Sequence, residues 1–262
     1  MTNLLLFESF IPTEMSYFNL IKLDATASTN EYLRERRLKG SSKEGDLVWT
    51  THQTAGRGQG NNEWVAEAGK SLAMSVYRTF DAYSPAQAFA LNTAFSTALV
   101  RGLSQLGVTE LRIKWPNDIL SGNFKIGGVL IENILKNDQL VSSILGFGLN
   151  INQENFSNLP HAASIFSVTQ KRWPIEQVLE VLCSALEKEP FIEVLTHADQ
   201  NLAAYNTCLW RKGKSTKFIN QKGDFYATIL GVNRYGKLKI VDKEDNKAEL
   251  TLSEARLSYL QG

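Results

Sequence analysis

The segment KWPNDILSGN occupies residues 114–123 and decides the local fold on both of its sides. A short strand ending at Lys114 is broken by Pro116, so the chain must turn there and present Asn117 and Asp118 at fixed positions. A carboxylate in such a turn can hold Mg²⁺ or act as a base toward an amine. The alternative is a plain proline turn capped by its own Asn or Asp side chain.

The next stretch, KIGGVLIE at residues 125–132, predicts a strongly apolar strand that pairs with the preceding one. Its two glycines, Gly127 and Gly128, remove side chains where a flat ligand can lie against the backbone. Lys125 then stands where it can reach a carboxylate or a phosphate of that ligand. The alternative is a β-bulge beside a surface lysine.

Hydrophobic periodicity on either side predicts an α+β fold in two parts: a larger mixed domain at 1–206 and a small C-terminal domain at 207–262. Strands are expected at 17–23, 46–51, 71–79, 111–114, 119–120, 125–135 and 140–150, with a hairpin turn at 136–138. Helices are expected at 28–39, 85–106, 177–186 and 197–205. Short strands at 216–219, 225–232, 237–241 and 247–252 predict a small β-barrel.

A glycine-rich loop, GRGQGNNEW at residues 56–64, is the strongest single ligand-binding pattern. Its alternating glycines allow positive φ and close backbone approach, and successive N–H groups in such a loop can form an anion-binding nest. Arg57 adds a planar cation suited to phosphate or carboxylate. The spacing fits neither a dinucleotide-binding fingerprint nor a phosphate-binding P-loop. The alternative is a glycine-rich hairpin with a surface arginine.

Two further segments place polar groups at the ends of expected elements. In GFGLNIN, Gly146 and Gly148 clear one face of a strand, and Asn150 and Asn152 follow on that face. Ser28-Thr29-Asn30 stands at a helix start, where hydroxyls and an amide suit either a polar heterocycle or a plain N-cap.

Composition excludes several classes of protein. The net charge of the 262 residues is +1, which gives no indication of a nucleic-acid or membrane partner, although residues 207–262 carry 11 Lys/Arg and 6 Asp/Glu. Cys183 and Cys208 form no metal or redox motif and fit a reducing cytoplasm, and the three histidines are scattered. The first 15 residues lack the basic region of a signal peptide and are too short for a membrane span.

The order of the motifs resembles the catalytic domain of the biotin–protein ligase family. In sequence, STN, QTAGRG, KWPND, KIGGVLIE and GFGLN follow one another between residues 20 and 152. The resemblance implies a catalytic domain like that of class II aminoacyl-tRNA synthetases, with a mixed sheet and flanking helices, and an SH3-like C-terminal barrel. It also implies ATP-dependent activation of biotin to biotinyl-5′-AMP, then transfer to a lysine of a biotin carboxyl carrier domain.

The same resemblance assigns expected roles to individual residues. Arg57, Lys125 and Asp118 are the expected catalytic residues. The expected biotin-binding residues are Ser28, Thr29, Asn30, Gln53, Gly56, Arg57, Gly58, Lys125, Gly127, Gly128, Gly146 and Gly148. The expected ATP-binding residues are Arg57, Gln59, Trp64, Lys114, Asn117, Lys125, Asn150 and Arg256. Mg²⁺ is expected on the ATP phosphates, with Asn150 or Asp118 as protein ligands.

Two departures and one rival accompany this resemblance. Gln59 stands where many relatives carry Arg, and this lowers the positive charge of the loop. Fewer than 20 residues precede the first expected strand, so no winged-helix domain and no DNA-binding role are expected. The rival is a lipoate or octanoate ligase or transferase of the same fold, although its RRxSGGG-type segment is absent from the sequence. The protein is expected in the cytoplasm, as a monomer or a homodimer.

Overall fold

The computed structural model describes residues 17–60, 62–156 and 159–259. The first 15 residues, for which neither a signal peptide nor a membrane span is expected, lie outside the described residues. The expectation of no winged-helix domain before the first strand falls on the same stretch. Within the described residues, no helix is both long enough and apolar enough to cross a membrane.

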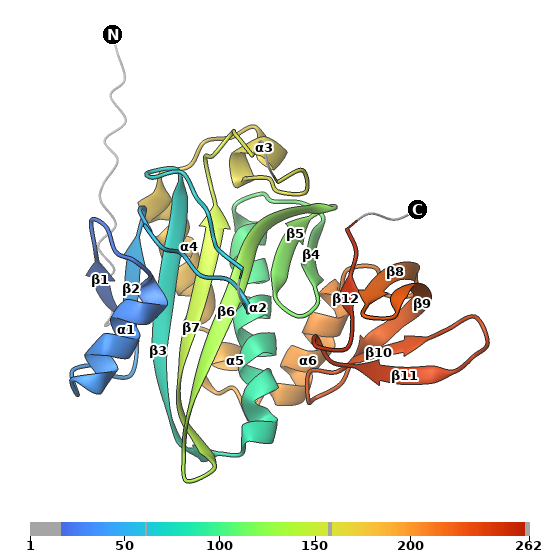
Figure 1. Ribbon diagram of the computed structural model, residues 1–262. Coiled ribbons are helices and arrows are strands. Elements are labelled where there is room, and N and C mark those ends of the chain that lie inside the picture. The colour runs from blue at the N-terminus through green and yellow to red at the C-terminus, as the bar shows by residue number, and fades with distance from the viewer. Residues whose placement is uncertain (1–16, 61, 157–158, 260–262) are drawn as a thin grey trace.

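A seven-stranded mixed sheet forms the body of the molecule. Its strands are β1 (Asn19–Lys22), β2 (Asp46–Thr50), β3 (Ser71–Tyr83), β4 (Leu111–Lys114), β5 (Asp118–Ser121), β6 (Phe124–Lys136) and β7 (Gln139–Asn150). They lie in the order β1-β2-β3-β7-β6-β5-β4 (Figure 1). Only β1 and β2 pair in parallel; the other neighbours are antiparallel. The three longest strands are therefore adjacent at the centre.

The hairpin between β6 and β7 shows how the sequence sets the register. Asn137 and Asp138 both have positive φ, 50° and 57°, and Lys136 pairs with Gln139 across the turn. A two-residue turn with both residues in this region matches the twist of the flanking strands. The hairpin thereby fixes which residues of β6 and β7 share a face.

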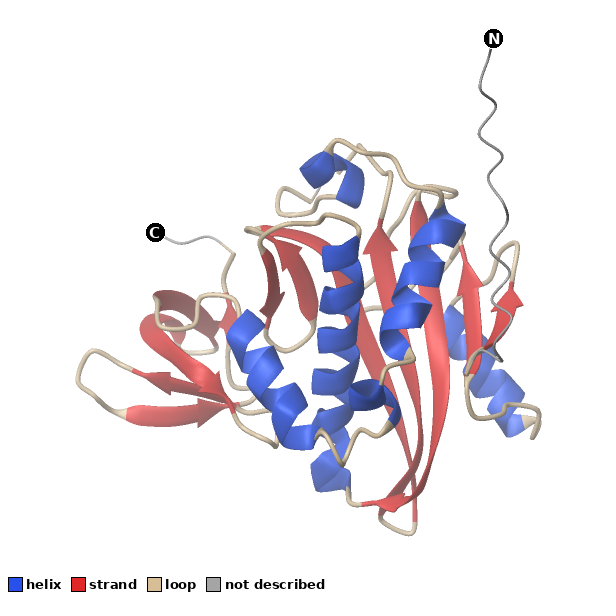
Figure 2. Cartoon of the chain, turned by 180° about the vertical axis from the view of Figure 1, so that it is seen from behind, coloured by secondary structure: helices blue, strands red, loops and turns tan. Residues whose placement is uncertain are grey.

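Helices cover one face of the sheet (Figure 2). They are the short η1 (Pro85–Gln87), α2 (Ala88–Gln105), α4 (Ile175–Leu186), α5 (Glu189–Ile192) and α6 (Ala198–Cys208). The short α3 (Ile165–Thr169) lies beyond the end of the central strands (Figure 1). α2 packs against both α4 and α6. Leu91, Phe95 and Leu99, spaced by four residues, are fully buried in the main hydrophobic core.

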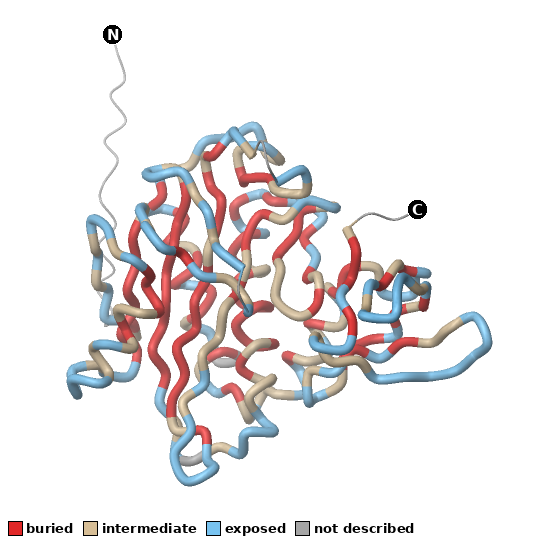
Figure 3. Tube along the Cα trace, in the orientation of Figure 1, coloured by how far each residue is buried: buried red, intermediate tan, exposed pale blue. Residues whose placement is uncertain are grey.

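The opposite face is covered at one end only, by α1 (Thr29–Leu38). Leu33 of this helix packs with Val48, Tyr77 and Ile144 in a small second core. The segment linking β2 to β3 crosses in front of the central strands (Figure 1). Of those strands, β3 and β7 are buried along most of their length, whereas most residues of β6 are of intermediate exposure or exposed (Figure 3).

A second sheet follows α6. Its strands are β8 (Ser215–Asn220), β9 (Gly223–Val232), β10 (Leu238–Val241), β11 (Lys247–Leu250) and β12 (Arg256–Leu257). They are antiparallel, in the order β11-β10-β9-β8-β12. No pairing joins β11 to β12 within the described part of the chain, so the expected closed barrel is not confirmed.

The turn between β4 and β5 joins the two sheets. Trp115 is buried, and its indole Nε1 donates a hydrogen bond to Gly236 O at 2.8 Å. The Tyr205 hydroxyl donates to Pro116 O at 2.8 Å, and Trp210 N donates to Ile113 O at 2.9 Å. The segment that carries Asn117 and Asp118 is therefore held from the side of the second sheet.

The expected α+β class, the mixed sheet and the separate antiparallel sheet are confirmed, with differences at the ends of elements. β3 continues to Tyr83, the long helix begins with a 3₁₀ turn at Pro85–Gln87, and α6 continues to Cys208. The short elements α3, α5 and β12 were not predicted, because five residues or fewer carry too little periodicity.

We predict that Leu33→Ala lowers the free energy of unfolding by about 2–5 kcal/mol, because it leaves a cavity between α1 and the sheet. Leu38→Ala, five residues later and 73% exposed, is the matched control and should stay within about 0.5 kcal/mol of the unaltered protein. Urea unfolding measures both. Equal losses in the two variants would contradict the packing role of Leu33.

Candidate active site

The centre of the site is a part of the sheet face without side-chain bulk. In the register of the sheet, Ala73 of β3 pairs with Gly148 of β7, Gly148 with Gly128 of β6, and Gly128 with Asp118 of β5. Paired residues of antiparallel strands project to the same face. The row therefore ends in the Asp118 carboxylate, and the only other side chain in it is the methyl group of Ala73. Gly146, two residues from Gly148, extends the bare area.

A cleft of about 460 Å³ lies over this area. Most of the residues predicted for the site line it: Ser28, Thr29, Asn30, Gln53, Arg57, Gly58, Gln59, Trp64, Lys114, Asn117, Asp118, Lys125, Gly128, Gly146, Gly148 and Arg256. Segments from both ends of the chain thus meet at one place. The volume lies within the range of sites for small molecules.

Three predicted residues do not line the cleft. Gly127 faces the opposite side of the sheet, where a Cβ would lie 2.7 Å from the Phe147 ring. Gly56 lies against its own loop, where a Cβ would stand 2.9 Å from Gln53 Nε2. Asn150 is buried and its Nδ2 donates to Ala163 O at 3.0 Å. These residues support the walls and lie behind the lining.

Hydroxyl and amide groups gather at the α1 end of the cleft. Thr29 N donates to Gln53 Oε1 at 2.9 Å, and the hydroxyl Oγ of the fully buried Ser75 lies 2.6 Å from both Thr29 Oγ1 and Asn30 Oδ1. Ser28 occupies the N-cap position of α1 without a side-chain capping bond. Its hydroxyl is therefore not engaged by the helix and faces the cleft.

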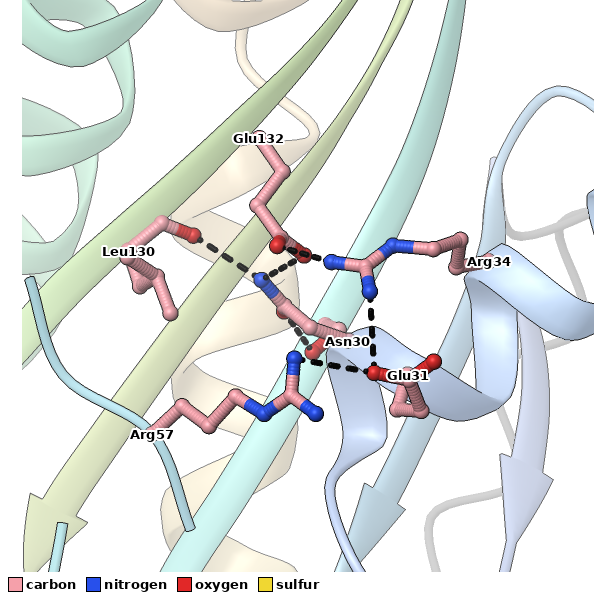
Figure 4. Close-up of polar contacts among 7 residues, drawn as sticks. Asn30, Glu31, Arg34, Arg57, Leu130 and Glu132 are labelled. Carbon is pink, nitrogen blue, oxygen red and sulfur yellow. Dashed lines mark hydrogen bonds and ion pairs between the residues drawn. The ribbon is translucent and has the colours of Figure 1, made fainter. Parts of the chain in front are cut away.

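A chain of charged groups links α1 to the glycine-rich loop and to β6 (Figure 4). Arg57 Nη1 pairs with Glu31 Oε2 at 3.0 Å, and Arg34 pairs with both Glu31 and Glu132. Asn30 Nδ2 donates to Glu132 Oε2 at 2.9 Å. Arg57, with 54% of its side chain exposed, therefore rests on a carboxylate that is itself fixed.

The glycine-rich loop is a hairpin, and two of its N–H groups are used within it. Gly58 N donates to Asn62 O at 2.7 Å, and Trp64 N donates to Gly56 O at 2.9 Å. Of the three loop glycines, only Gly60 has positive φ, 61°. The local geometry thus follows the hairpin alternative, while Arg57 and Trp64 are directed to the cleft.

Trp64 lies directly over the bare row. A Cβ built on Gly148 would stand 2.8 Å from indole atoms of Trp64, and one on Gly146 would stand 3.0 Å from Asn30 Cγ. Lys125 Nζ lies 5.7 Å from the centre of the Trp64 ring, within cation–π range. Glycine is required at 146 and 148 because other side chains occupy the space above them.

Two lysines share one carboxylate at the other end of the cleft. Lys125 Nζ lies 2.6 Å from Asp118 Oδ1, and Lys114 Nζ lies 3.9 Å from Asp118 Oδ2. Burial lowers the pKa of Lys114; the Asp118 charge raises it and the Lys125 charge lowers it further. With Arg57 and Arg256, the cleft has four cationic side chains in its lining, which suits a polyanionic ligand.

The residues fit Mg²⁺ only as an ion carried on the phosphates of a substrate. Among the described residues, no group of three His, Cys, Asp or Glu side chains is placed to hold a metal. Both oxygens of Asp118 already have partners, in Lys125 and in the Tyr259 hydroxyl at 2.7 Å. Asn150 Oδ1 is buried without a hydrogen-bond partner in the described structure, but Asn150 does not line the cleft.

Sequence reasoning did not identify four residues of this site: Glu31, Ser75, Glu132 and Tyr259. Glu31 follows the STN segment directly and Glu132 ends KIGGVLIE, so the first lies beside a recognised motif and the second inside one. Ser75 shares the cleft face of β3 with Ala73 and could have been found from strand alternation. Nothing in the local sequence relates Tyr259 to Asp118, 141 residues away.

The profile of the biotin/lipoate A/B protein ligase family matches residues 23–150. The chain resembles this family over just under half of its length. The matched range holds every residue of the cleft lining between Ser28 and Gly148, and it excludes the second sheet.

Relatives of the chain are named as ligases. The chain is 28% identical over 248 residues to the bifunctional ligase/repressor BirA of Bacillus spizizenii, covering 90% of this chain and 74% of that protein. It is 33% identical over 148 residues to the biotin–[acetyl-CoA-carboxylase] ligase of Mycobacterium tuberculosis, covering 55% and 53%. The second alignment thus spans about half of each protein.

The fold is similar to that of the biotin protein ligase from Aquifex aeolicus, solved in complex with biotin and ATP. The TM-score is 0.73 at 24% identity, covering 92% of this chain and 98% of that one. The biotin protein ligase from Leishmania major in complex with biotinyl-5-AMP has a TM-score of 0.58 at 21% identity, covering 89% and 98%. At these identities the likeness concerns the fold.

We predict that Glu31→Gln frees Arg57 and raises the rate of trypsin cleavage after it by roughly two- to five-fold, the range for an exposed ion pair. Mass spectrometry of the first fragments locates the cut. Glu35→Gln, one turn later on the exposed side of α1, is the matched control and should not change the rate. Unchanged cleavage at Arg57 in the Glu31 variant would show that the pair does not hold the loop.

Proposed function

We propose that this chain is a biotin–protein ligase. A biotin carboxylate oxygen attacks the α-phosphorus of ATP; the bond from that phosphorus to the bridging oxygen breaks, and pyrophosphate leaves. The ε-amine of an acceptor lysine then attacks the acyl carbon of biotinyl-5′-AMP, forms an amide, loses a proton and releases AMP. One observation carries the proposal: a cleft over a bare sheet face has neutral hydrogen-bonding groups at one end and cations at the other.

The neutral end suits the ureido ring of biotin. Ser28, Thr29, Asn30 and Gln53 offer hydroxyl and amide groups there, and the ring can lie beside Asn30 and Trp64, which fill the space above Gly146 and Gly148. The ligand's tail then runs along the bare row toward Gly128, and its carboxylate reaches Lys125. This end needs no charge, because the ureido group is neutral.

The cationic end suits the phosphates of MgATP. Lys125, Lys114 and Arg256 line the cleft, while Arg57 of the loop is paired with Glu31 at the α1 end. Trp64 offers a flat surface for adenine, and Asn117 and Gln59 offer amides. Arg57 can exchange its pairing with Glu31 for a pairing with phosphate, which closes the loop over a water-sensitive intermediate.

Positioning and charge neutralisation are sufficient for this reaction, since no protein nucleophile is required. The cysteines agree with that: burial raises the pKa of the Cys183 thiol to about 12 and also raises the pKa of Cys208. Neither residue lines the cleft. Asp118, expected as a base or a metal ligand, is better suited to hold Lys125, because both its oxygens are engaged.

The finer parts of the assignment also belong to this proposal. Residues 1–206 form the synthetase-like catalytic unit and residues 207–262 the unit corresponding to an SH3-like domain. The acceptor is a biotin carboxyl carrier domain of a biotin-dependent carboxylase, and the enzyme acts in the cytoplasm. The supporting observations are the separate second sheet and the names of the relatives.

The rival within the family is a lipoate or octanoate ligase. We predict that the protein catalyses ATP–pyrophosphate exchange with biotin and that labelled biotin labels a lysine of a carrier domain. Exchange with lipoate should be at least about ten-fold slower, because the neutral end of the cleft is built of hydrogen-bonding groups that suit a polar ring. Faster exchange with lipoate would favour the rival. No label on the carrier would refute the ligase.

We predict that Lys125→Ala slows biotin-dependent ATP–pyrophosphate exchange by at least about 100-fold, as expected for a lost charged donor at the reacting centre. Lys136→Ala, at the exposed far end of the same strand, is the matched control and should retain full exchange. Near-normal exchange in Lys125→Ala would refute the role given to this lysine.

A further inference from the structure

Tyr259 enters the cleft from the second sheet. It follows β12, which pairs with β8, and the preceding residue's backbone, Ser258 N, donates to Lys217 O at 3.0 Å. The Tyr259 hydroxyl donates to Asp118 Oδ2 at 2.7 Å and the residue lines the cleft. This hydrogen bond joins the end of the second sheet to the cluster of Asp118, Lys114 and Lys125 on the first sheet.

The phenol ring is held from several sides. It stacks on the His161 ring at a centroid distance of 5.0 Å and an interplanar angle of 10°, and Trp210 lies 6.1 Å away. Lys114 Nζ lies 4.0 Å from the ring centroid. The backbone near His161 is itself tied to the site, since Lys125 N donates to His161 O at 2.7 Å. The hydroxyl therefore has a fixed direction.

The two carboxylate oxygens of Asp118 have different partners, and this gives the Tyr259 hydroxyl a chemical role. Oδ2 accepts from Tyr259, while Oδ1 is left to Lys125 at 2.6 Å. Burial and the Asp118 charge raise the pKa of Tyr259, so the phenol stays a donor. Without that donor, the carboxylate can rotate toward Lys114, whose Nζ is 3.9 Å from Oδ2.

We propose that Tyr259 is a positioning residue for the activation step: its hydroxyl fixes the Asp118 carboxylate so that Lys125 is aimed into the cleft. This inference rests on the proposed ligase function. It makes the second sheet a part of the activating site, in addition to any contact it makes with an acceptor protein.

The test is Tyr259→Phe, which removes the hydroxyl and keeps the ring. With saturating biotin, kcat for ATP–pyrophosphate exchange should fall about ten-fold, the loss expected for a hydrogen bond to a charged group. KM for biotin should change less than about two-fold, since the hydroxyl acts through Lys125 on the reacting atoms. Tyr235→Phe, an exposed tyrosine of the same part of the chain, should behave as the unaltered protein.

A double-mutant cycle distinguishes positioning from a general structural effect. In an Asp118→Asn background, Tyr259→Phe should cause no further fall in kcat, because the two groups act together. Unchanged kcat in Tyr259→Phe, or an equal fall in both backgrounds, would overturn the inference. If the unaltered chain shows no biotin-dependent exchange, the proposed function fails, and the inference with it.

Discussion

The active-site cleft depends on the absence of side-chain volume along one row of the sheet. Gly148 and Gly128 lie side by side between Ala73 and Asp118, so no Cβ stands on that part of the floor. The indole of Trp64 and the amide of Asn30 occupy the space that larger residues at 148 and 146 would need. The loop, helix α1 and the floor are thus fitted to one another, and a single methyl group at Gly148 would displace the wall of the cleft.

Charge is distributed unevenly around that floor. Two lysines share the carboxylate of Asp118, so the cluster holds a surplus positive charge in a partly buried place. Burial lowers the pKa of Lys114, and the charge of Lys125 lowers it further through like-charge repulsion. An anionic ligand relieves it. At the α1 end, Glu31 and Glu132 balance Arg34 and Arg57, so the first contact of the loop arginine is with the protein itself.

Much of the fold followed from alternation and periodicity, because the central strands and α2 are long. The motif order also brought together most of the lining, since the glycines and Lys125 lie on elements whose faces can be deduced. Orientation within a motif was harder: Gly127 and Gly128 are neighbours, yet only one faces the cleft, and the choice depends on the register with β7. The hairpin hydrogen bonds of the loop and the contact of Tyr259 with Asp118 depend on tertiary packing, which local patterns do not encode.

The distance in sequence between Asp118 and Tyr259 has a consequence for the order in which the protein acquires its parts. During synthesis on the ribosome, the seven-stranded sheet is complete when residue 150 has been made, and N-terminal units fold first. The cluster around Asp118 then still lacks its phenol, which is added 141 residues after the carboxylate. The last segment to be made therefore completes the site, since it brings Leu252, Arg256 and Tyr259 to the cleft, and a chain that stops before it lacks these three side chains.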